Sequence, residues 1–335
     1  MSGADARFCV EMLPRVSRTF ALSIEALPPG LREAVRVSYL LCRVVDTVED
    51  AASLPWPARE ALFETFDDCL LDDGADPAGF ERLAAALGAG GPDEALCRGA
   101  GAVFRAFRAL PATDREAVRP HVLDLSLGMR MYAARAARLG RFRLRDLPDL
   151  ERYCYYVAGT VGELLTPLFA AWVPGLDPET RVALQARSAS FGQGLQLVNV
   201  VKDVAEDLER GALFLPETLL AEHGAPTDAR LLDPAFREAG VAAIRAVAGR
   251  ARAHLERARE YTLLWPIPAG SEVVRFCAVP LLLALGTLTE VESGPDTLLR
   301  GRSPKVSREA VARVLEAAGR VSSDPGALRD LLRQA

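Results

Sequence analysis

The sequence between residues 39 and 50 reads YLLCRVVDTVED, and the sequence between residues 196 and 207 reads QLVNVVKDVAED. Both stretches end in the pattern D-x-x-E-D, and the rest of each is rich in Val and Leu. The two aspartates of each pattern are four residues apart, which on a helix places both carboxylates on one face, about a turn apart. The two stretches therefore predict apolar helices that each present a pair of carboxylates.

Paired carboxylates in apolar sequence indicate metal chemistry. A carboxylate that leaves water without a partner costs several kcal/mol. A single D-x-x-E-D is most often a solvated acidic face, but two copies within apolar helices are harder to explain in this way. Mg²⁺ binds a few carboxylates and completes its coordination with water and substrate phosphate. We therefore expect a helical enzyme that binds a diphosphate through Mg²⁺.

Further polar residues extend each cluster along one helical stripe. The steps of three and four residues match the helical period, and the remaining positions are mostly apolar. A solvent-facing helix would be polar over a wider arc, so these narrow stripes suit a cavity with a polar mouth. The first stripe contains Tyr39, Arg43, Asp46 and Asp50, and the second contains Gln196, Asn199, Asp203 and Asp207.

The composition favours an all-α fold. The 335 residues are 50% hydrophobic and 25% charged, and we find no alternating strand pattern with hairpin turns. No boundary separates independent domains, so we expect one helical domain over residues 1–335. The net charge of −5 argues against a nucleic-acid partner, which would require a basic face.

The sequence predicts neither export nor a membrane span. Charged residues interrupt the first segment, so we expect no signal peptide. The apolar run over residues 276–288 is shorter than the roughly 20 residues that cross a bilayer and contains Pro280, so we interpret it as a buried core helix. The 6 cysteines form no C-x-x-C pair and suit buried free thiols. We expect a soluble cytoplasmic protein, with peripheral association at the inner face of the membrane left open.

A third stretch, residues 153–162, reads YCYYVAGTVG. Gly159 and Gly162 lower the helix propensity, so they require a packing reason. Small residues let a bulky group approach the helix backbone, and that group is either another helix or a ligand. The residues themselves leave core packing and cavity lining equally open.

Five segments, in this order, resemble the squalene/phytoene synthase family of head-to-head prenyltransferases. The resemblance spans nearly the whole chain. It implies an all-α isoprenoid-synthase domain with a central active-site channel, in which two acidic helices face each other near the mouth. The segments are Ser17-Arg18-Thr19-Phe20, residues 39–50, residues 153–162, residues 196–207, and the sequence RGALFLP at residues 210–216.

The resemblance also implies roles for individual residues. The implied Mg²⁺ ligands are the four aspartates of the two clusters, supported by Glu49 and Glu206, with Asn199 as a further metal or water ligand. The implied diphosphate-binding residues are Ser17, Arg18, Arg43, Gln196 and Asn199. Lys202 stands where the family usually has Arg, and it keeps the charge but loses the bidentate fork. Tyr153, with Tyr39 and Arg43, is implied in catalysis, and Tyr153 would transfer a proton or steer the cation. Phe20, Phe276 and the face from Val157 to Gly162 would line the apolar channel.

Within the family, the C-terminal third favours the squalene synthase branch of bacterial type. Residues 276–280 read FCAVP, and the basic segment at residues 303–308 reads SPKVSR. This branch condenses two farnesyl diphosphates through presqualene diphosphate and reduces the product to squalene with NADPH. Residues 155–162 are close to the phytoene synthase version, which would use geranylgeranyl diphosphate. Dehydrosqualene or hydroxysqualene as product, a head-to-tail prenyltransferase or terpene cyclase, and a non-catalytic helical scaffold are the alternatives.

Overall fold

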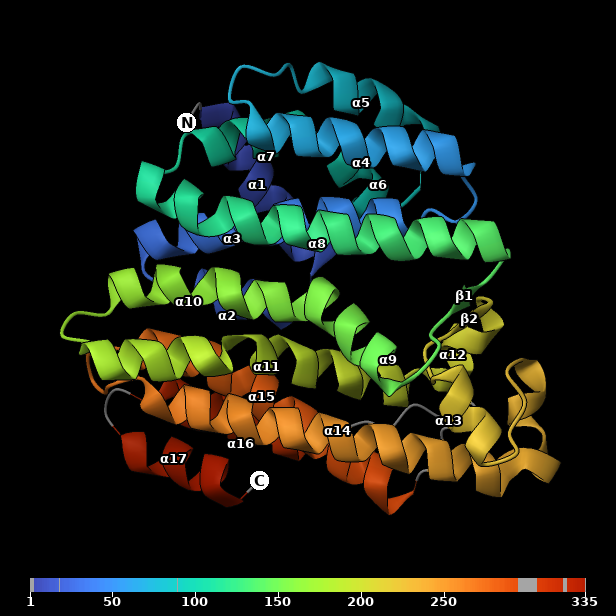
Figure 1. Cartoon of the computed structure of the whole chain (residues 1–335). Coiled ribbons are helices and arrows are strands. Elements are labelled where there is room, and N and C mark those ends of the chain that lie inside the picture. Colours follow the sequence, from blue (N-terminus) through green and yellow to red (C-terminus); the bar gives the residue numbers. More distant parts are fainter. Residues whose placement is uncertain (1–2, 18, 89, 295–305, 322–323, 335) are drawn as a thin grey trace. The chain divides into compact units, whose positions relative to one another are not determined.

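The computed structural model describes the chain except residues 1–2, 18, 89, 295–305, 322–323 and 335 (Figure 1). The described part consists of helices and one pair of two-residue strands, so the predicted all-α fold class is confirmed. The chain divides into two compact units. Unit 1 contains Met1–Ala137 and Glu163–Pro174, and unit 2 contains Arg138–Gly162 and Gly175–Ala335. One single domain over residues 1–335 stays a prediction.

Unit 1 is built around α3 (Pro29–Asp50), the helix that carries the first acidic cluster. Pro29 lies at its start, where the missing N–H of proline has no cost. Leu40, Leu41, Val44 and Val45 are buried and form a continuous apolar face against the surrounding helices. The other elements are α1 (Gly3–Val16), α2 (Thr19–Glu25), α4 (Trp56–Leu71), α5 (Ala78–Ala84), η1 (Ala85–Leu87), α6 (Pro92–Arg98), α7 (Ala100–Arg108), most of α8 (Ala112–Leu139) and most of α10 (Thr160–Trp172).

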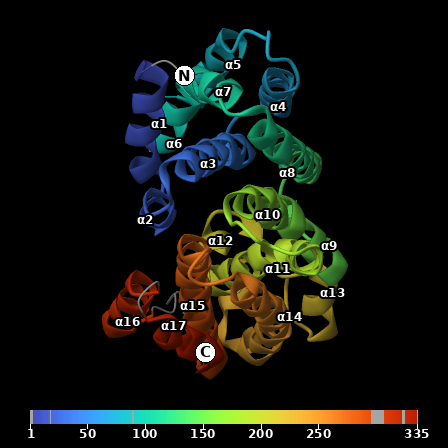
Figure 2. The same ribbon diagram turned by 90° about the vertical axis from the view of Figure 1, so that its left-hand side faces the viewer.

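Unit 2 is built around α11 (Pro178–Lys202), which packs against α14 (Arg237–Leu264) and α15 (Ser271–Ser293). Figure 2 shows α15 between α11 and the C-terminal helices α16 (Arg308–Gly319) and α17 (Pro325–Gln334). The remaining elements are β1 (Phe142–Arg143), α9 (Leu147–Cys154), the π-helical turn η2 (Tyr155–Gly159), α12 (Val204–Glu209), β2 (Ala212–Leu213), α13 (Glu217–Glu222), η3 (Ala229–Leu232) and η4 (Pro234–Phe236).

Glycines let α11 approach the 153–162 segment at backbone distance. A Cβ atom at Gly192 would lie 1.8 Å from the carbonyl oxygen of Ala158, and one at Gly162 would lie 2.0 Å from that of Ser188. A Cβ atom at Gly159 would meet the Tyr155 ring at 3.0 Å. Of the two explanations that the sequence left open for the glycines of residues 153–162, helix packing is therefore the one that the structure supports. Channel lining by the rest of this segment stays a prediction.

The helix α15 is longer than the apolar run that the sequence suggested. It continues over 23 residues through Pro280, although proline removes one hydrogen bond of the helix. By length and composition alone it is the one helix of the described residues that could cross a membrane, but 67% of its most apolar window is buried. Core helices of soluble proteins pass the same test, so this feature is weak support for a span. Its burial agrees with the interpretation as a core helix.

We predict that Gly192→Ala destabilises the protein. The added methyl group would overlap the backbone of η2, so the two helices must separate, and overpacking of this kind costs roughly 1–3 kcal/mol or more. Urea unfolding monitored by circular dichroism measures the change. The matched control is Gly249→Ala on α14, where a Cβ atom meets nothing within 4 Å. That substitution should stabilise the protein by about 0.5–1 kcal/mol. Equal stability of the two variants would contradict the close approach of α11 and η2.

Candidate active site

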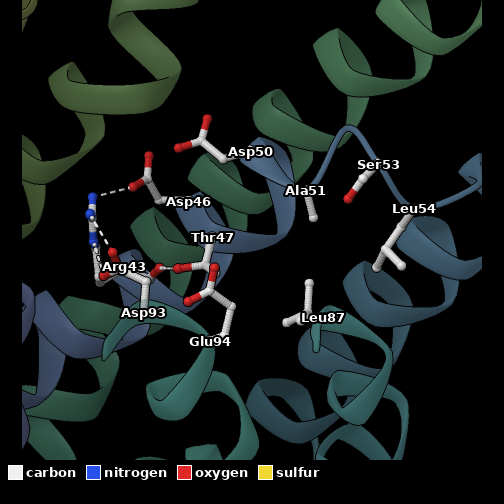
Figure 3. A pocket seen from close by; sticks show the side chains of 10 residues that line it. All are labelled: Arg43, Asp46, Thr47, Asp50, Ala51, Ser53, Leu54, Leu87, Asp93 and Glu94. Atoms are coloured by element: carbon white, nitrogen blue, oxygen red, sulfur yellow. Dashed lines mark hydrogen bonds and ion pairs between the residues drawn. The ribbon is translucent and has the colours of Figure 1, made fainter. Parts of the chain in front are cut away.

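The first acidic cluster lies in the last turn of α3, which ends at Asp50. The carboxylates of Asp46 and Asp50 lie on the same side of this helix end (Figure 3). Burial, and then the charge of Asp50, raises the pKa of Asp46, although 32% of the Asp46 side chain remains exposed. The carboxyl end of a helix also carries partial negative charge, which disfavours acidic groups and favours cations. The cluster is therefore an electrostatically unfavourable arrangement that a cation would stabilise.

Arg43 contacts carboxylates on two sides. Its Nη1 donates to Asp46 within α3, while its Nε and Nη2 donate to the two carboxylate oxygens of Asp93 at 2.8 and 3.1 Å. Asp93 comes from α6, and sequence reasoning missed it (Figure 3). The sequence gives only a weak signal for it, an acidic residue that follows a Gly-Gly-Pro break in the first turn of a short helix. The structure thus adds one carboxylate to the surroundings of the cluster.

A pocket of about 210 Å³ opens beside these residues. Carboxylates from α3 and α6 line one side, and small or apolar side chains line the other. Such a mixed lining provides ionic groups for a charged ligand and an apolar wall next to them. The lining residues are Arg43, Asp46, Thr47, Asp50, Ala51, Ser53, Leu54, Leu87, Asp93 and Glu94 (Figure 3).

Arg59 of α4 holds the end of α3 in place. Its Nε donates to the carbonyl oxygen of Val48 at 3.1 Å, and its Nη2 donates to that of Glu49. Helix ends leave carbonyl groups without partners in the helix, so this guanidinium satisfies two of them. Only 5% of Arg59 is exposed, and burial lowers its pKa. Sequence reasoning missed this residue as well, because a single Arg within a helix of mixed composition carries no recognisable pattern.

Ser17 and Phe20 of the first motif lie close to Tyr39 of the first acidic stretch in unit 1. The hydroxyl of Ser17 accepts a hydrogen bond from the backbone N–H of Phe20 at 3.1 Å. The ring of Phe20 lies 6.0 Å from that of Tyr39, and the Tyr39 hydroxyl donates to the carbonyl oxygen of Val16 at 3.5 Å. Burial raises the pKa of Tyr39. Arg18, which was predicted to bind substrate, lies outside the described residues.

The sequence predicted the second acidic cluster on one uninterrupted helix, and this prediction is wrong. The helix α11 ends at Lys202, and Asp203 has φ −104° and ψ 12°, outside the helical range, before α12 begins. Asp residues favour helix ends because their side chains compete with the backbone for hydrogen bonds. The backbone N–H of Asp203 still donates to the backbone carbonyl oxygen of Asn199 at 3.1 Å. The backbone N–H of Asp207 donates to the backbone carbonyl oxygen of Asp203 at 2.8 Å. The two aspartates therefore remain about one turn apart across the junction.

Each aspartate of the second cluster has a cationic neighbour. Asp203 pairs with Lys202, and Asp207 pairs with Arg210. Asp207 is 6% exposed, and burial raises its pKa. Among the other predicted residues of this region, Asn199 and Glu206 are exposed and Gln196 is half-buried. Like the first cluster, the second combines crowded carboxylates with a positive side chain.

Tyr153 belongs to an aromatic cluster in unit 2. Its ring lies 5.2 Å from Phe142 and 5.5 Å from Phe214, and those two rings are 4.7 Å apart. Phe142 is in β1, which pairs in parallel with β2, and Phe214 follows β2 directly. The three rings therefore anchor the 210–216 segment to α9. The other predicted aromatic residue of this unit, Phe276, is 4% exposed within α15.

The donor set of the clusters suits a hard cation. All predicted ligands offer oxygen, which Mg²⁺ prefers, and none offers sulfur. Among the described residues, no group of three or more His, Cys, Asp or Glu side chains is gathered closely enough to hold a metal ion alone. Mg²⁺ usually keeps several waters and is held by one or two carboxylates together with substrate phosphates. The residues present therefore fit magnesium bound together with a diphosphate better than a closed structural metal site.

Comparison with known proteins identifies similar chains. The family model described as squalene/phytoene synthase matches residues 13–310. The squalene synthase of Schizosaccharomyces pombe is 29% identical over 295 residues, which cover 87% of this chain and 61% of that protein. Botryococcus squalene synthase from Botryococcus braunii is 30% identical over 292 residues, which cover 86% of this chain and 58% of that protein. A solved complex of TcSQS with the ligand BPH1237 has a TM-score of 0.80 and 26% identity, and the match covers 99% of this chain and 90% of that one.

The two squalene synthases are longer than the matched region, since the alignment spans only 61% and 58% of their lengths. The family match, in contrast, extends over most of the present chain and includes both acidic clusters, the 153–162 segment and the 210–216 segment. This chain therefore belongs to the squalene/phytoene synthase family.

Proposed function

We propose that the protein catalyses the Mg²⁺-dependent head-to-head condensation of two farnesyl diphosphates. The product of this step is presqualene diphosphate, which the enzyme then reduces to squalene with NADPH. The observation that carries the proposal is the occurrence, in a chain of this family, of two acidic clusters at helix ends, each with a bound cationic side chain. Both clusters have the groups needed to bind a metal–diphosphate complex.

The proposed metal ligands are the carboxylates of the two clusters. Magnesium bound there would stabilise the negative charge that develops on the departing diphosphate. The raised pKa values of Asp46 and Asp207 reflect burial without enough compensating positive charge, and a divalent cation would supply that charge. The set consists of Asp46, Asp50, Asp203 and Asp207, with Glu49, Glu206 and Asn199 in support.

The proposed substrate-binding residues come from segments of both units. Guanidinium groups bind phosphate oxygens in a planar fork, and amide and hydroxyl groups complete the contacts. Tyr153 would move a proton or stabilise a cation, with Tyr39 and Arg43 acting beside the first cluster. Phe20 and Phe276 would exclude water from the reacting carbocations. The remaining proposed residues are Ser17, Arg18, Gln196 and Lys202.

We propose squalene as the product, in place of the alternatives, because the two relatives described above are squalene synthases. Phytoene from geranylgeranyl diphosphate, and dehydrosqualene or hydroxysqualene made without a reductant, are the second candidates within the same chemistry. The segment at residues 303–305, part of the basic stretch that motivated NADPH, lies outside the described residues. We propose a cytoplasmic location, with peripheral contact at the inner face of the membrane, where the long apolar product would partition.

We predict that Asp46→Asn and Asp203→Asn each lower turnover by orders of magnitude. Each substitution removes one negative charge from a proposed metal site while keeping the shape of the side chain, so ionisation of the substrate loses its electrostatic support. Release of diphosphate from farnesyl diphosphate in the presence of Mg²⁺ measures the effect. Asp68→Asn, an exposed position of α4, is the matched control and should retain full activity. Diphosphate release at the normal rate by either cluster variant, with the helical content unchanged, would rule out the proposed metal sites.

We also predict the identity of the product. The rearranged cation must be quenched by hydride, by proton loss or by water, and these routes give squalene, dehydrosqualene or hydroxysqualene. The pure protein with farnesyl diphosphate and Mg²⁺ should accumulate a cyclopropyl diphosphate, which becomes squalene once NADPH is added. Mass spectrometry of the extracted hydrocarbon identifies the product. A conjugated triene, or phytoene from geranylgeranyl diphosphate, formed equally well without NADPH would assign the enzyme to the carotenoid branch.

A further inference from the structure

Asp93 makes a contact that none of the sequence motifs includes. Its two carboxylate oxygens accept hydrogen bonds from Nε and Nη2 of Arg43 at 2.8 and 3.1 Å, which is the bidentate geometry of a fork. The pair joins α6 to α3. A second contact between the same helices runs from the thiol of Cys97 to the carbonyl oxygen of Val44 at 3.7 Å. The helix α6, which carries Asp93, therefore contacts α3 through two separate side chains.

The contact uses one edge of the guanidinium and leaves the other edge for the acidic cluster. Nε and Nη2 face Asp93, whereas Nη1 faces Asp46. A guanidinium is planar, so fixing one edge also fixes the direction of the other. Arg43 and Asp93 both line the pocket beside the cluster, and their side chains are 33% and 34% exposed. Asp93 thus holds one edge of the guanidinium, while Nη1, which donates to Asp46, lies on the edge that faces the cluster.

We propose that Asp93 is a positioning residue that holds Arg43 for an anion at the first acidic cluster. The inference rests on the proposed function, because the anion is the diphosphate that binds together with Mg²⁺. Without Asp93, the guanidinium is free to turn its fork to Asp46, three residues further along the same helix. It would then bind that carboxylate through two N–H groups instead of the single Nη1 contact, and its orientation toward the diphosphate would be lost.

The alternative explanation is that the Arg43–Asp93 pair serves only to stabilise the fold. Ion pairs that are about one-third exposed contribute little to stability, so the Arg43–Asp93 pair adds little to the fold. The Asp5–Arg105 pair is a suitable comparison within the same unit. Arg105 donates from Nε and Nη2 to one oxygen of Asp5 at 3.1 and 2.8 Å, which joins α1 to α7. Removing this second pair should affect stability without affecting ligand binding.

Calorimetric binding of inorganic pyrophosphate with Mg²⁺ to the full chain tests the inference without turnover. We expect Asp93→Asn to weaken binding about tenfold, the size of one lost charge-assisted contact. Arg43→Gln should weaken binding at least as much, and adding Asp93→Asn to it should cause no further loss, because Asp93 acts through Arg43. Asp5→Asn should bind pyrophosphate like the unmodified protein. Asp93→Glu, which keeps the charge, should recover part of the affinity if Asp93→Asn is too unstable to measure.

Several results would overturn the inference. If the unmodified protein binds Mg²⁺–pyrophosphate and Asp93→Asn binds it equally well, Asp93 does not position Arg43, while the proposed function stands. Independent, additive losses in the double variant would show that Asp93 acts by a separate route. If the unmodified protein itself fails to bind Mg²⁺–pyrophosphate, the proposed function fails, and the role of Asp93 fails with it.

Discussion

The burial of closely spaced carboxylates at the ends of apolar helices is the constraint on which the site depends. Asp46 lies in the last turn of α3, close to Asp50, where the helix dipole is also unfavourable. Arg43 offsets part of this cost through its contact with Asp46, and Arg59 satisfies carbonyl groups where the helix ends. Burial of the Asp46 carboxyl, and then the charge of Asp50, still raises the pKa of Asp46. A protein keeps such an arrangement when a cation and a polyanion complete it, which is the basis of the proposed Mg²⁺–diphosphate site.

The second cluster also places carboxylates at a helix end, but with a different local structure. Glycines let the helix α11 pack closely against its neighbours: a Cβ atom at Gly192 would overlap η2, and one at Gly194 would lie 2.8 Å from the Leu255 side chain of α14. The helix then breaks at Asp203, and α12 continues with the buried Asp207. Close packing thus provides the rigid support, and the break places the carboxylates at a helix end. The aromatic cluster around Tyr153 holds the following 210–216 segment against the same unit.

The sequence predicted the features that depend on periodicity and missed those that depend on single contacts. The apolar pattern predicted the helices, and the i, i+4 spacing predicted both pairs of carboxylates. The break at Asp203 was missed because one non-helical residue leaves the period almost unchanged. Asp93 and Arg59 were missed because they act on α3 from helices that only tertiary packing brings beside it. The core helix through Pro280 was predicted, but the full extent of α15, Ser271–Ser293, was missed because its first and last turns contain polar and charged residues.

The most direct test of the proposed metal–diphosphate site is a crystal structure with Mn²⁺ in place of Mg²⁺ and a non-hydrolysable thio analogue of farnesyl diphosphate. Anomalous scattering locates the metal ions independently of any assumption about the site. We predict anomalous peaks within roughly 2.0–2.5 Å of carboxylate oxygens from both Asp46 and Asp203, bridged by the diphosphate of the analogue. Metal ions bound at only one cluster, or a diphosphate bound away from both, would contradict the proposed site.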